Sequence, residues 1–508
     1  MLDRLKSNLL YKIRKLEDRE YNQDCFYREM LHKTLMKNNV FLLGNGFDLA
    51  LKKLSSYQDF LLYLFLIKLY LQVNGGNLQG SQLNCDILFE RCKIIDQKIS
   101  SVVKIVKRKI ETIKQDNKAL SSLCNFFNEK GSFLELFSRV IFQEYYLDVN
   151  KFNDSMKDHL LDNELVWSFS DYLFNKYKIR RLTDLSQFTD LYNTNLDKCV
   201  EEFFKILFPD AKDKSSIYIN GWLDVESLIN FIVLPDEILE NRFLQNKLSA
   251  SYVSLLNRLN VALNIASASK IYNSLQSFTD QFCEFLALQD IGFITLGKSA
   301  LASILEQYEI TVNHDLNDFF PFVNYVDEFC NTISSVIDFN YTLSSQRIFE
   351  DIYNLSQKMR TKFEIYHVNG CIYVDNHKYE SNNAIFGYTN TSQRQVNINA
   401  FKFEKRAQRQ LKNVRSFDFD RLTHNRFNLM ILGHSCSPAD KDIIYPLLSS
   451  PNLRFAIIFC HSTDAKLSIY KNLNDILGPE KLDHLTRQTT ELNNRLIWAV
   501  LKDKKNAI

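Results

Sequence analysis

The feature that most constrains the fold is a short apolar run, Val40 to Leu43, which lies far from every other strand-like run of the chain. Residues 50–333 carry apolar side chains at spacings of three and four, a pattern typical of helices. Further strand-like runs follow at 336–339, 365–368, 384–386, 429–432 and 453–459. Helix-like segments, at 343–360, 398–426 and 438–449, separate most of these runs. This alternation predicts an α/β fold with a doubly wound, mostly parallel sheet, interrupted by a large all-helical insertion.

The same pattern predicts three parts of the chain. Residues 1–36 are charged and helix-like, and we interpret them as an N-terminal helical appendage. Residues 37–50 and 334–508 together form the predicted α/β domain, because the first strand needs the later strands as partners. Residues 51–333 form the predicted helical insertion domain, and the segment from Leu49 to Leu71 is expected to be largely one helix.

Small or hydrogen-bonding residues follow four of the predicted strands. They are Gly44, Asn45, Gly46, Phe47 and Asp48 after the first run, then Asn340, Tyr341 and Thr342, then Asn369 and Gly370, and then Gly433, His434 and Ser435. Ligands of open α/β sheets bind outside the carboxyl ends of the strands. The two glycines of the first corner would let the backbone approach a ligand, and the following helix would offer N–H groups to phosphate. Turn chemistry without a ligand is the alternative at each single corner.

Three of these residues are candidates for specific chemistry. Asn340 would fix a ribose hydroxyl or a water molecule. Asp48 would hydrogen-bond ribose or stabilise developing positive charge, and its alternative role is to cap the following helix. His434 is a candidate for proton transfer, because the usual pKa of histidine suits that task. Its alternative role is to cap the next turn or to form a hydrogen bond to a neighbouring loop, and His461 is a weaker candidate for proton transfer.

Composition excludes several classes of function. The 62 Lys and Arg nearly balance the 60 Asp and Glu, so no global charge points to nucleic acid or a membrane. The basic segments 104–114 and 402–412 are interpreted as solvated helix faces, so nucleic acid is an unlikely partner. The longest apolar run, Leu61 to Val73, is too short to span a bilayer. Neither the cysteines nor the histidines show metal-ligand spacing, and the N-terminus lacks a secretory signal, so we expect a cytoplasmic protein without a metal.

Five sequence islands resemble the AbiH family of bacterial abortive-infection proteins. They are Gly44 to Ala50, Ser56 to Phe60, Gly221 to Glu226, Phe339 to Thr342, and Gly433 to Ser435 with Asp440. More distantly, the layout is similar to the sirtuin-like, Rossmann-type NAD-binding domains of phage-defence NADases. In those domains a glycine-rich turn holds the dinucleotide, an Asn-Tyr pair contacts ribose, and a His-Gly pair supplies the catalytic histidine.

The resemblance implies an anti-phage effector that binds NAD and hydrolyses it to arrest infected cells. It also implies a phage-derived trigger or a partner defence protein, and the helical parts would suit homo-oligomerisation. The chain departs from the family pattern His-x-His-Gly, because it has His367-Val368-Asn369-Gly370. Asn369 cannot accept a proton near neutral pH, whereas His367 lies on the same face of the strand two residues earlier.

Two alternatives therefore stay open. The first is a catalytically impaired nucleotide-binding sensor or switch of phage defence, which the asparagine at position 369 favours. The second is a nucleic-acid-cleaving effector, for which the basic segments and the acidic pair Asp224 and Glu226 are the only support.

Overall fold

A computed structural model describes most of the chain in two compact units. The described residues are 38–74, 97–129, 132–134, 173–182, 189–207, 225, 229, 265–290, 297–305, 307–310, 332–355, 363–375, 378–388, 401–414, 419–486 and 495–501. The first unit, called the sheet unit, comprises Met1–Lys52, Ile294–Val368 and Arg415–Ile508. The second, called the helical unit, comprises Lys53–Phe293 and Asn369–Val414. The predicted appendage at 1–36 lies outside the described residues.

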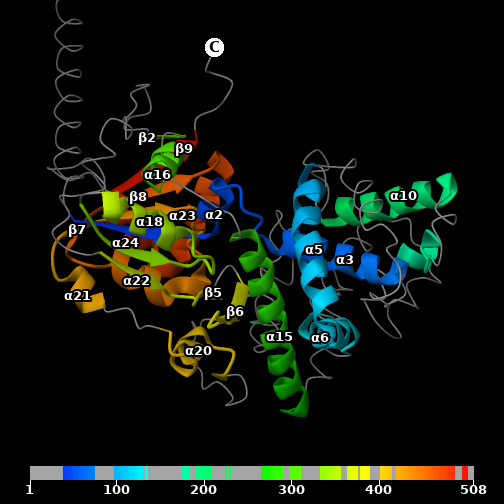
Figure 1. The fold of residues 1–508 in the computed structure, drawn as a ribbon. Coiled ribbons are helices and arrows are strands. Elements are labelled where there is room, and N and C mark those ends of the chain that lie inside the picture. The colour runs from blue at the N-terminus through cyan, green and yellow to red at the C-terminus, as the bar shows by residue number, and fades with distance from the viewer. Residues whose placement is uncertain are drawn as a thin grey trace, which may run out of the picture. The chain divides into compact units, whose positions relative to one another are not determined.

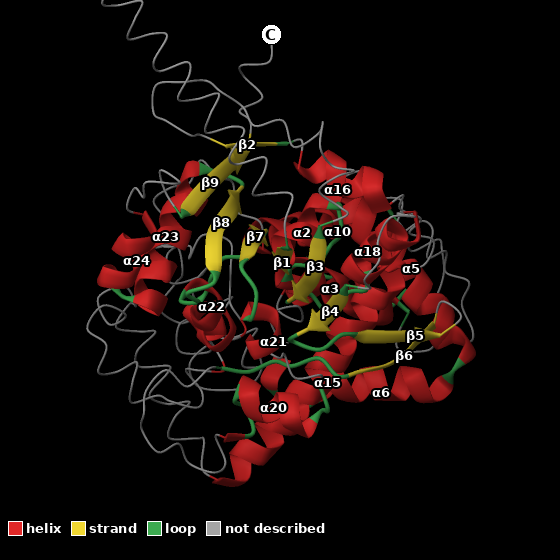
Figure 2. Ribbon diagram, turned by 90° about the vertical axis from the view of Figure 1, so that its left-hand side faces the viewer, coloured by secondary structure: helices red, strands yellow, loops and turns green. Residues whose placement is uncertain are grey.

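The sheet unit is built on a seven-stranded sheet (Figure 2). Its strands are β1 (Asn39–Leu43), β2 (Tyr308–Ile310), β3 (Ile333–Asp338), β4 (Glu364–His367), β7 (Phe427–Leu432), β8 (Leu453–Cys460) and β9 (Leu496–Leu501). They lie in the order β2-β9-β8-β7-β1-β3-β4. All neighbouring pairs are parallel except β2 with β9. The prediction of a mostly parallel sheet is confirmed.

The first strand lies in the middle of this sheet. Phe41 pairs with Val336 of β3 on one side and with Met430 of β7 on the other. Every residue of β1 is buried, because both edges are hydrogen-bonded and both faces are covered. Phe41 and Leu43 face one hydrophobic core, whereas Val40 and Leu42 face the other. This explains the continuous apolar run, which is typical of a parallel strand buried on both faces.

Helices cover both faces of the sheet, as a doubly wound fold requires. One core includes side chains of α2 (Asn45–Ala50), α16 (Gly297–Leu305) and α18 (Ser344–Leu355). The opposite core includes side chains of α22 (Lys441–Leu448), α23 (Thr463–Leu477) and α24 (Pro479–Thr486). The short helices α21 (Phe419–Thr423) and η3 (Pro438–Asp440) complete the described helices of this unit.

In the helical unit, α3 (Tyr57–Val73) is apolar on nearly all sides and packs against other helices of the unit, which Figure 1 labels. The unit also contains α5 (Gln97–Gln115), α6 (Asn117–Asn128), α10 (Asp190–Leu207), α15 (Ile265–Asp290), α20 (Lys405–Leu411) and the antiparallel strands β5 (Ile372–Asp375) and β6 (Lys378–Asn382). Ser56 and Asp59 form a capping box that begins α3. The α3 ring of Phe60 contacts Phe278, Phe282 and Phe285 of α15. A helix that is apolar all round is expected to be buried.

Several sequence-based expectations differ from the structure. The predicted helix from Leu49 to Leu71 is interrupted: α2 ends at Ala50, and Lys52 adopts φ 60°, a conformation that a helix cannot continue through. The predicted strand at 384–386 is wrong, because Ile385 donates its N–H to the loop carbonyl of Asn369 rather than joining a ladder. The expected continuous helix over 398–426 is wrong, because within its described residues α20 ends at Leu411 and residues 412–414 are not helical, whereas α21 is a separate helix. Strands β2, β5, β6 and β9 were not predicted.

The division of the chain also places two segments differently from the predicted domains. Residues 369–414 belong to the helical unit, and residues 294–333 belong to the sheet unit. In the described part of the chain, no helix combines the length and the hydropathy that a membrane span needs.

Shortening Leu42 tests the central position of β1. Leu42→Ala leaves a cavity in a core that is fully buried, so we expect a loss of about 2–5 kcal/mol in the free energy of unfolding. Leu49→Ala is the matched control, because Leu49 is 39% exposed on the adjacent helix; its effect should stay within about 0.5 kcal/mol. Urea unfolding followed by circular dichroism measures both. Equal losses in the two variants would contradict a central β1.

Candidate functional site at the carboxyl ends of the strands

The loop after β1 and the loop after β7 pack against each other backbone to backbone. The Gly44 N–H donates to the carbonyl of Leu432 at 3.0 Å, and the Gly46 N–H donates to that of Gly433 at 2.8 Å. A Cβ atom at Gly44 would lie 2.6 Å from the Gly433 oxygen, and one at Gly46 would lie 2.7 Å from the Gly433 Cα. Gly433 itself has φ +68° and would bring a Cβ within 2.4 Å of the Phe47 nitrogen. All three glycines are therefore required by this close approach.

This packing engages backbone N–H groups of the first corner that were expected from the sequence to bind phosphate. Gly44 and Gly46 donate to carbonyls of the β7 loop, and Phe47 donates to the Gly44 carbonyl at 2.9 Å. The side chain of Phe47 is buried in the core. Asn45 is half-buried at the start of α2. The glycines are thus explained by loop packing, and a ligand at this edge would need other donors.

Asp338 is the centre of the polar cluster at this edge of the sheet. It is the last residue of β3 and is fully buried. Its Oδ1 accepts hydrogen bonds from the backbone N–H and the side-chain Nδ2 of Asn340, both at 2.9 Å. Its Oδ2 accepts a hydrogen bond from the Ser345 hydroxyl at the start of α18. A buried carboxylate needs such partners, because an unpaired charge in the interior is costly.

The orientation of Asn340 follows from these contacts. Its backbone N–H and its side-chain Nδ2 both donate to Asp338, which assigns the amide so that Oδ1 points away from that carboxylate. Asn340 is buried, with 4% of its surface exposed. Its oxygen accepts no hydrogen bond from the described residues. The arrangement leaves a fixed acceptor for a hydroxyl group or a water molecule.

Asp48 holds the neighbouring corner. Although it lies in the first turn of α2, it does not cap the helix, because Gly44 is the capping residue. Its carboxylate accepts the Thr342 hydroxyl, at 3.0 Å from Oδ1 and 2.7 Å from Oδ2. The Thr342 hydroxyl lies 2.8 Å from that of Ser344. Asp48 thus connects the corner after β1 to the corner after β3.

His367 is the histidine that the fold brings to this cluster. It is the last residue of β4, pairs with Asp338 in the ladder, and its side chain is 13% exposed. Nδ1 lies 3.4 Å from Asp338 Oδ2, which suits a charge interaction, and neither ring nitrogen has a hydrogen-bond partner. Burial lowers the pKa of His367, but Asp338, the backbone of Asn340 and the charge of Asp48 together outweigh burial. The pKa therefore lies above the usual 6.5.

His434 caps the turn that follows it, which is one of the two alternative roles expected from the sequence. Nδ1 accepts the Cys436 N–H at 2.9 Å, and Nε2 lies 3.4 Å from Asp440 Oδ2. The ring packs on Phe339 with centroids 4.3 Å apart. These contacts assign the neutral tautomer that carries its proton on Nε2. Cys436 beside it is fully buried, and burial raises the pKa of its thiol, so the thiolate is disfavoured.

The remaining predicted residues fall in different places. Tyr341 is half-buried and Ser435 is exposed, both at the strand-end edge. Asn369 and Gly370 belong to the helical unit. There the Asn369 carbonyl accepts the Ile385 N–H at 2.8 Å, and Gly370 has φ +75° against the backbone of Asn383.

Two further predictions concern the acidic pair and a metal. Asp224 and Glu226 lie outside the described residues. Among the residues that the structure does describe, no group of three or more His, Cys, Asp and Glu side chains is arranged to hold a metal ion.

Sequence reasoning missed three members of the cluster. Asp338 interrupts an apolar strand run, and a carboxylate at such a position was a signal that the sequence offered. Ser345 lies in the first turn of α18, where serine is common for local reasons. Asn472 donates from α23 to the Ser435 carbonyl at 2.9 Å, and no local pattern pointed to it.

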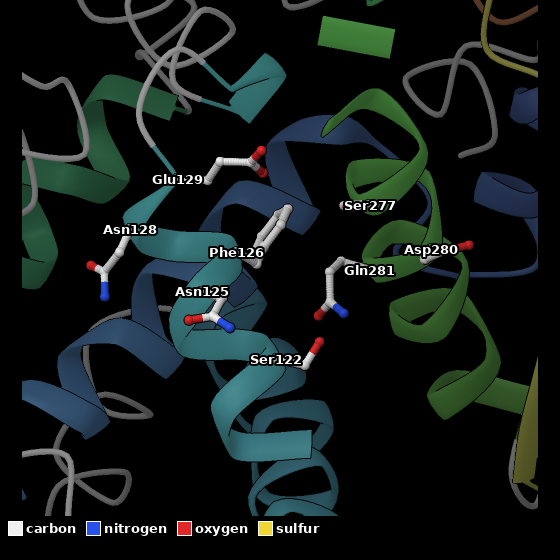
Figure 3. A pocket seen from close by; sticks show the side chains of 8 residues that line it. All are labelled: Ser122, Asn125, Phe126, Asn128, Glu129, Ser277, Asp280 and Gln281. Carbon is white, nitrogen blue, oxygen red and sulfur yellow. The ribbon is translucent and has the colours of Figure 1, made fainter. Parts of the chain in front are cut away.

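A hollow of about 550 Å³ lies elsewhere, between α6 and α15 of the helical unit (Figure 3). Its lining is mainly polar and includes Asn125, Gln281 and Glu129 around the ring of Phe126. None of the strand-end residues lines it. The strand-end cluster, formed by Asp48, Asp338, Asn340 and His367, remains the candidate site because its buried acids and histidine lie at one edge of the sheet.

Comparison with known proteins gives one match. The model of a family described as bacteriophage abortive infection AbiH matches residues 40–460, which span the corners after β1, β3, β4 and β7. No curated protein and no solved structure matches the chain. The family match confirms the resemblance of the sequence islands and points to phage defence by abortive infection. Because the match covers far more than half of its residues, this chain belongs to the bacteriophage abortive infection AbiH family.

Proposed function

We propose that the protein is an abortive-infection effector that binds a nicotinamide dinucleotide at the strand-end cluster and hydrolyses it. The observation that carries the proposal is the buried group formed by Asp338, Asn340 and His367, with Asp48 at the adjoining corner. It combines a fixed hydrogen-bond acceptor, a carboxylate and a histidine with a raised pKa at one sheet edge. Perturbed titratable groups of this kind are typical of functional sites.

The strand order supports a nucleotide as the ligand. Numbered along the chain, the six parallel strands β1, β3, β4, β7, β8 and β9 lie in the spatial order 3-2-1-4-5-6. This is the order of the dinucleotide-binding doubly wound sheet. The strand order reverses between β1 and β7, and ligands of such sheets bind at that switch point, outside the carboxyl ends of the strands. The corners of Gly44 and Gly433 lie there.

Hydrolysis of the bond to nicotinamide requires that the protein bind the dinucleotide and supply one base. Water attacks the ribosyl carbon, the bond to nicotinamide breaks, and its electron pair leaves with the ring as neutral nicotinamide. The transition state resembles an oxocarbenium ion, so carboxylates near the ribose stabilise it. Asn340 Oδ1 would hold a ribose hydroxyl, and His367, oriented by Asp338, would take the proton of the attacking water.

The ligand would reach the cluster from its more exposed members. Asn45, Tyr341 and Ser435 are half-buried or exposed at this edge, whereas the N–H groups of Gly44 and Gly46 have acceptors within the protein. We therefore assign the phosphates to side chains at this edge. A phage-derived trigger or a partner defence protein would switch the effector on, and a homo-oligomer is the expected form.

Removing the Asn340 amide tests the proposed reaction. Asn340→Ala deletes the acceptor for ribose, so we expect the fall in NAD during phage challenge to disappear, with a loss of at least about 100-fold in turnover. Chromatography of NAD, nicotinamide and ADP-ribose from challenged cells measures it. Asn425→Ala is the matched control at an exposed turn of the same unit and should behave like wild type.

Intact NAD in cells that are nevertheless protected by the wild-type protein would rule out the nicotinamide dinucleotide as substrate. Purified protein that binds NAD without cleaving it, even with lysate of infected cells as the source of trigger, would exclude hydrolysis and retain binding.

The raised pKa of His367 predicts a pH-dependent contribution to stability. The folded state holds the proton more tightly than the unfolded chain, so His367 stabilises the fold fully below pH 6.5 and loses this contribution as the pH rises through the folded pKa. The difference in unfolding free energy between wild type and His367→Gln should therefore be larger at pH 5.5 than at pH 8.5, as urea denaturation at both values would show. His461→Gln, at an exposed site, controls for the loss of an imidazole. A pH-independent difference would contradict the charge interaction with Asp338.

A nucleotide-binding sensor that has lost catalysis is the second candidate. It is favoured by the two engaged nitrogens of His434 and by the asparagine at 369, where the resemblance expects the catalytic histidine. If this candidate is correct, wild-type protein should bind NAD without turnover, and Asn369→His should gain NAD hydrolysis in the chromatographic assay. High wild-type turnover would dismiss it.

A further inference from the structure

Three arginines lie at the amino ends of three adjacent strands of the sheet. Arg426 directly precedes β7, Arg454 is the second residue of β8, and Arg495 directly precedes β9. The strands β7, β8 and β9 are neighbours in the sheet (Figure 2). Because parallel strands begin at the same edge, the three side chains share the edge opposite to the strand-end cluster.

Hydrogen bonds fix the backbone around the three arginines. The Arg495 guanidinium donates from Nη2 to the Leu453 carbonyl and from Nε to the Arg454 carbonyl at 3.4 Å. The Arg495 backbone is fixed as well, since its carbonyl accepts the Ala456 N–H at 2.8 Å. On the other side, the Arg426 carbonyl accepts the side-chain amide of Asn38 at 3.0 Å. The backbone positions of the three arginines are therefore set by the sheet.

The positive charge of the cluster has no counter-ion. None of the three guanidiniums forms an ion pair with a carboxylate of the described residues, and Arg454 Nη1 is buried without a hydrogen-bond partner. Burial lowers the pKa of Arg454, and the nearby charge of Arg426 lowers it further. Burial also lowers the pKa of Arg495. Like charges gathered without an anion are unfavourable, and a bound anion would relieve this.

We propose that Arg426, Arg454 and Arg495 form an anion site that binds a phosphate group. The planar guanidinium presents donors in a fork that matches phosphate oxygens, and guanidiniums gathered at one edge of a sheet suit phosphate recognition. The site is separate from the strand-end cluster, because the strand from Arg454 to Cys460 spans about 20 Å. It therefore does not depend on hydrolysis of a dinucleotide. The phosphate belongs either to a free nucleotide or to a nucleic acid, which share this chemistry.

Calorimetric titration of the full-length protein with inorganic phosphate and with ADP tests the site. Wild type should bind both, and Arg454→Gln should weaken binding by about ten- to a hundredfold, the usual effect of losing a charge-assisted hydrogen bond. Arg454→Lys keeps the charge but loses the planar guanidinium, so its affinity for phosphate should lie between those of wild type and Arg454→Gln. Arg406→Gln is the charge-matched control, because Arg406 is exposed on α20 of the helical unit, and it should bind like wild type.

A fluorescent 20-nucleotide RNA separates the two sources of phosphate. The site is assigned to nucleic acid if the protein binds this RNA more tightly than ADP, if the affinity for RNA falls steeply with salt, and if Arg454→Gln abolishes the binding. Binding of ADP alone assigns it to a free nucleotide. If Arg454→Gln does not fold, Arg426→Gln repeats the test at an exposed position.

Binding that is equal in wild type, Arg454→Gln and Arg426→Gln would overturn the proposal, as would the absence of phosphate binding in wild type. Arg454→Gln should leave NAD hydrolysis unchanged, so failure of this site and failure of the proposed hydrolysis are distinguishable.

Discussion

The pairing of β1 on both edges is the constraint on which the sheet unit depends. A single five-residue strand from the start of the described chain fills the space between β3 and β7, and it separates the two hydrophobic cores. Its carboxyl end sets the position of Gly44 and Gly46, whose missing side chains let the β7 loop approach. Without that approach, the corners that carry Asp48 and His434 would not meet at one edge.

A buried carboxylate organises the polar side of the same edge. Asp338 orients Asn340, accepts Ser345 and faces His367, so one side chain fixes residues from β3, α18 and β4. Such a group is costly to bury and is stable only when its oxygens are satisfied. Asp338 fixes the residues around it. Among the described residues, the Asn340 side-chain oxygen and the His367 ring are left without hydrogen-bond partners, which is the condition expected of a preorganised site.

Much of the fold was predictable because its signals are local. Short apolar runs and the glycine turn were sufficient for β1, β3, β4, β7 and β8 and for the doubly wound class. The break between α2 and α3 was not predictable from the apolar pattern, because it depends on the positive φ of Lys52 and on the cap at Ser56. At the site, Asn340, Asp48 and His367 were predicted, but the engagement of the Gly44 and Gly46 amides was not. Contacts between loops separated by nearly 400 positions leave no periodic signature in the sequence.

The distance along the chain between β1 and its partners has a consequence for synthesis on the ribosome. Gly44 packs against Gly433, and β1 pairs with β3 and β7. The sheet unit can therefore assemble only after these later segments have emerged from the ribosome. Non-local parallel pairing is slow in any case. An incomplete nascent chain therefore contains no assembled strand-end cluster. For a protein of a family that acts by abortive infection, the order of translation itself delays the assembly of the cluster until β7 and the loop after it have been synthesised.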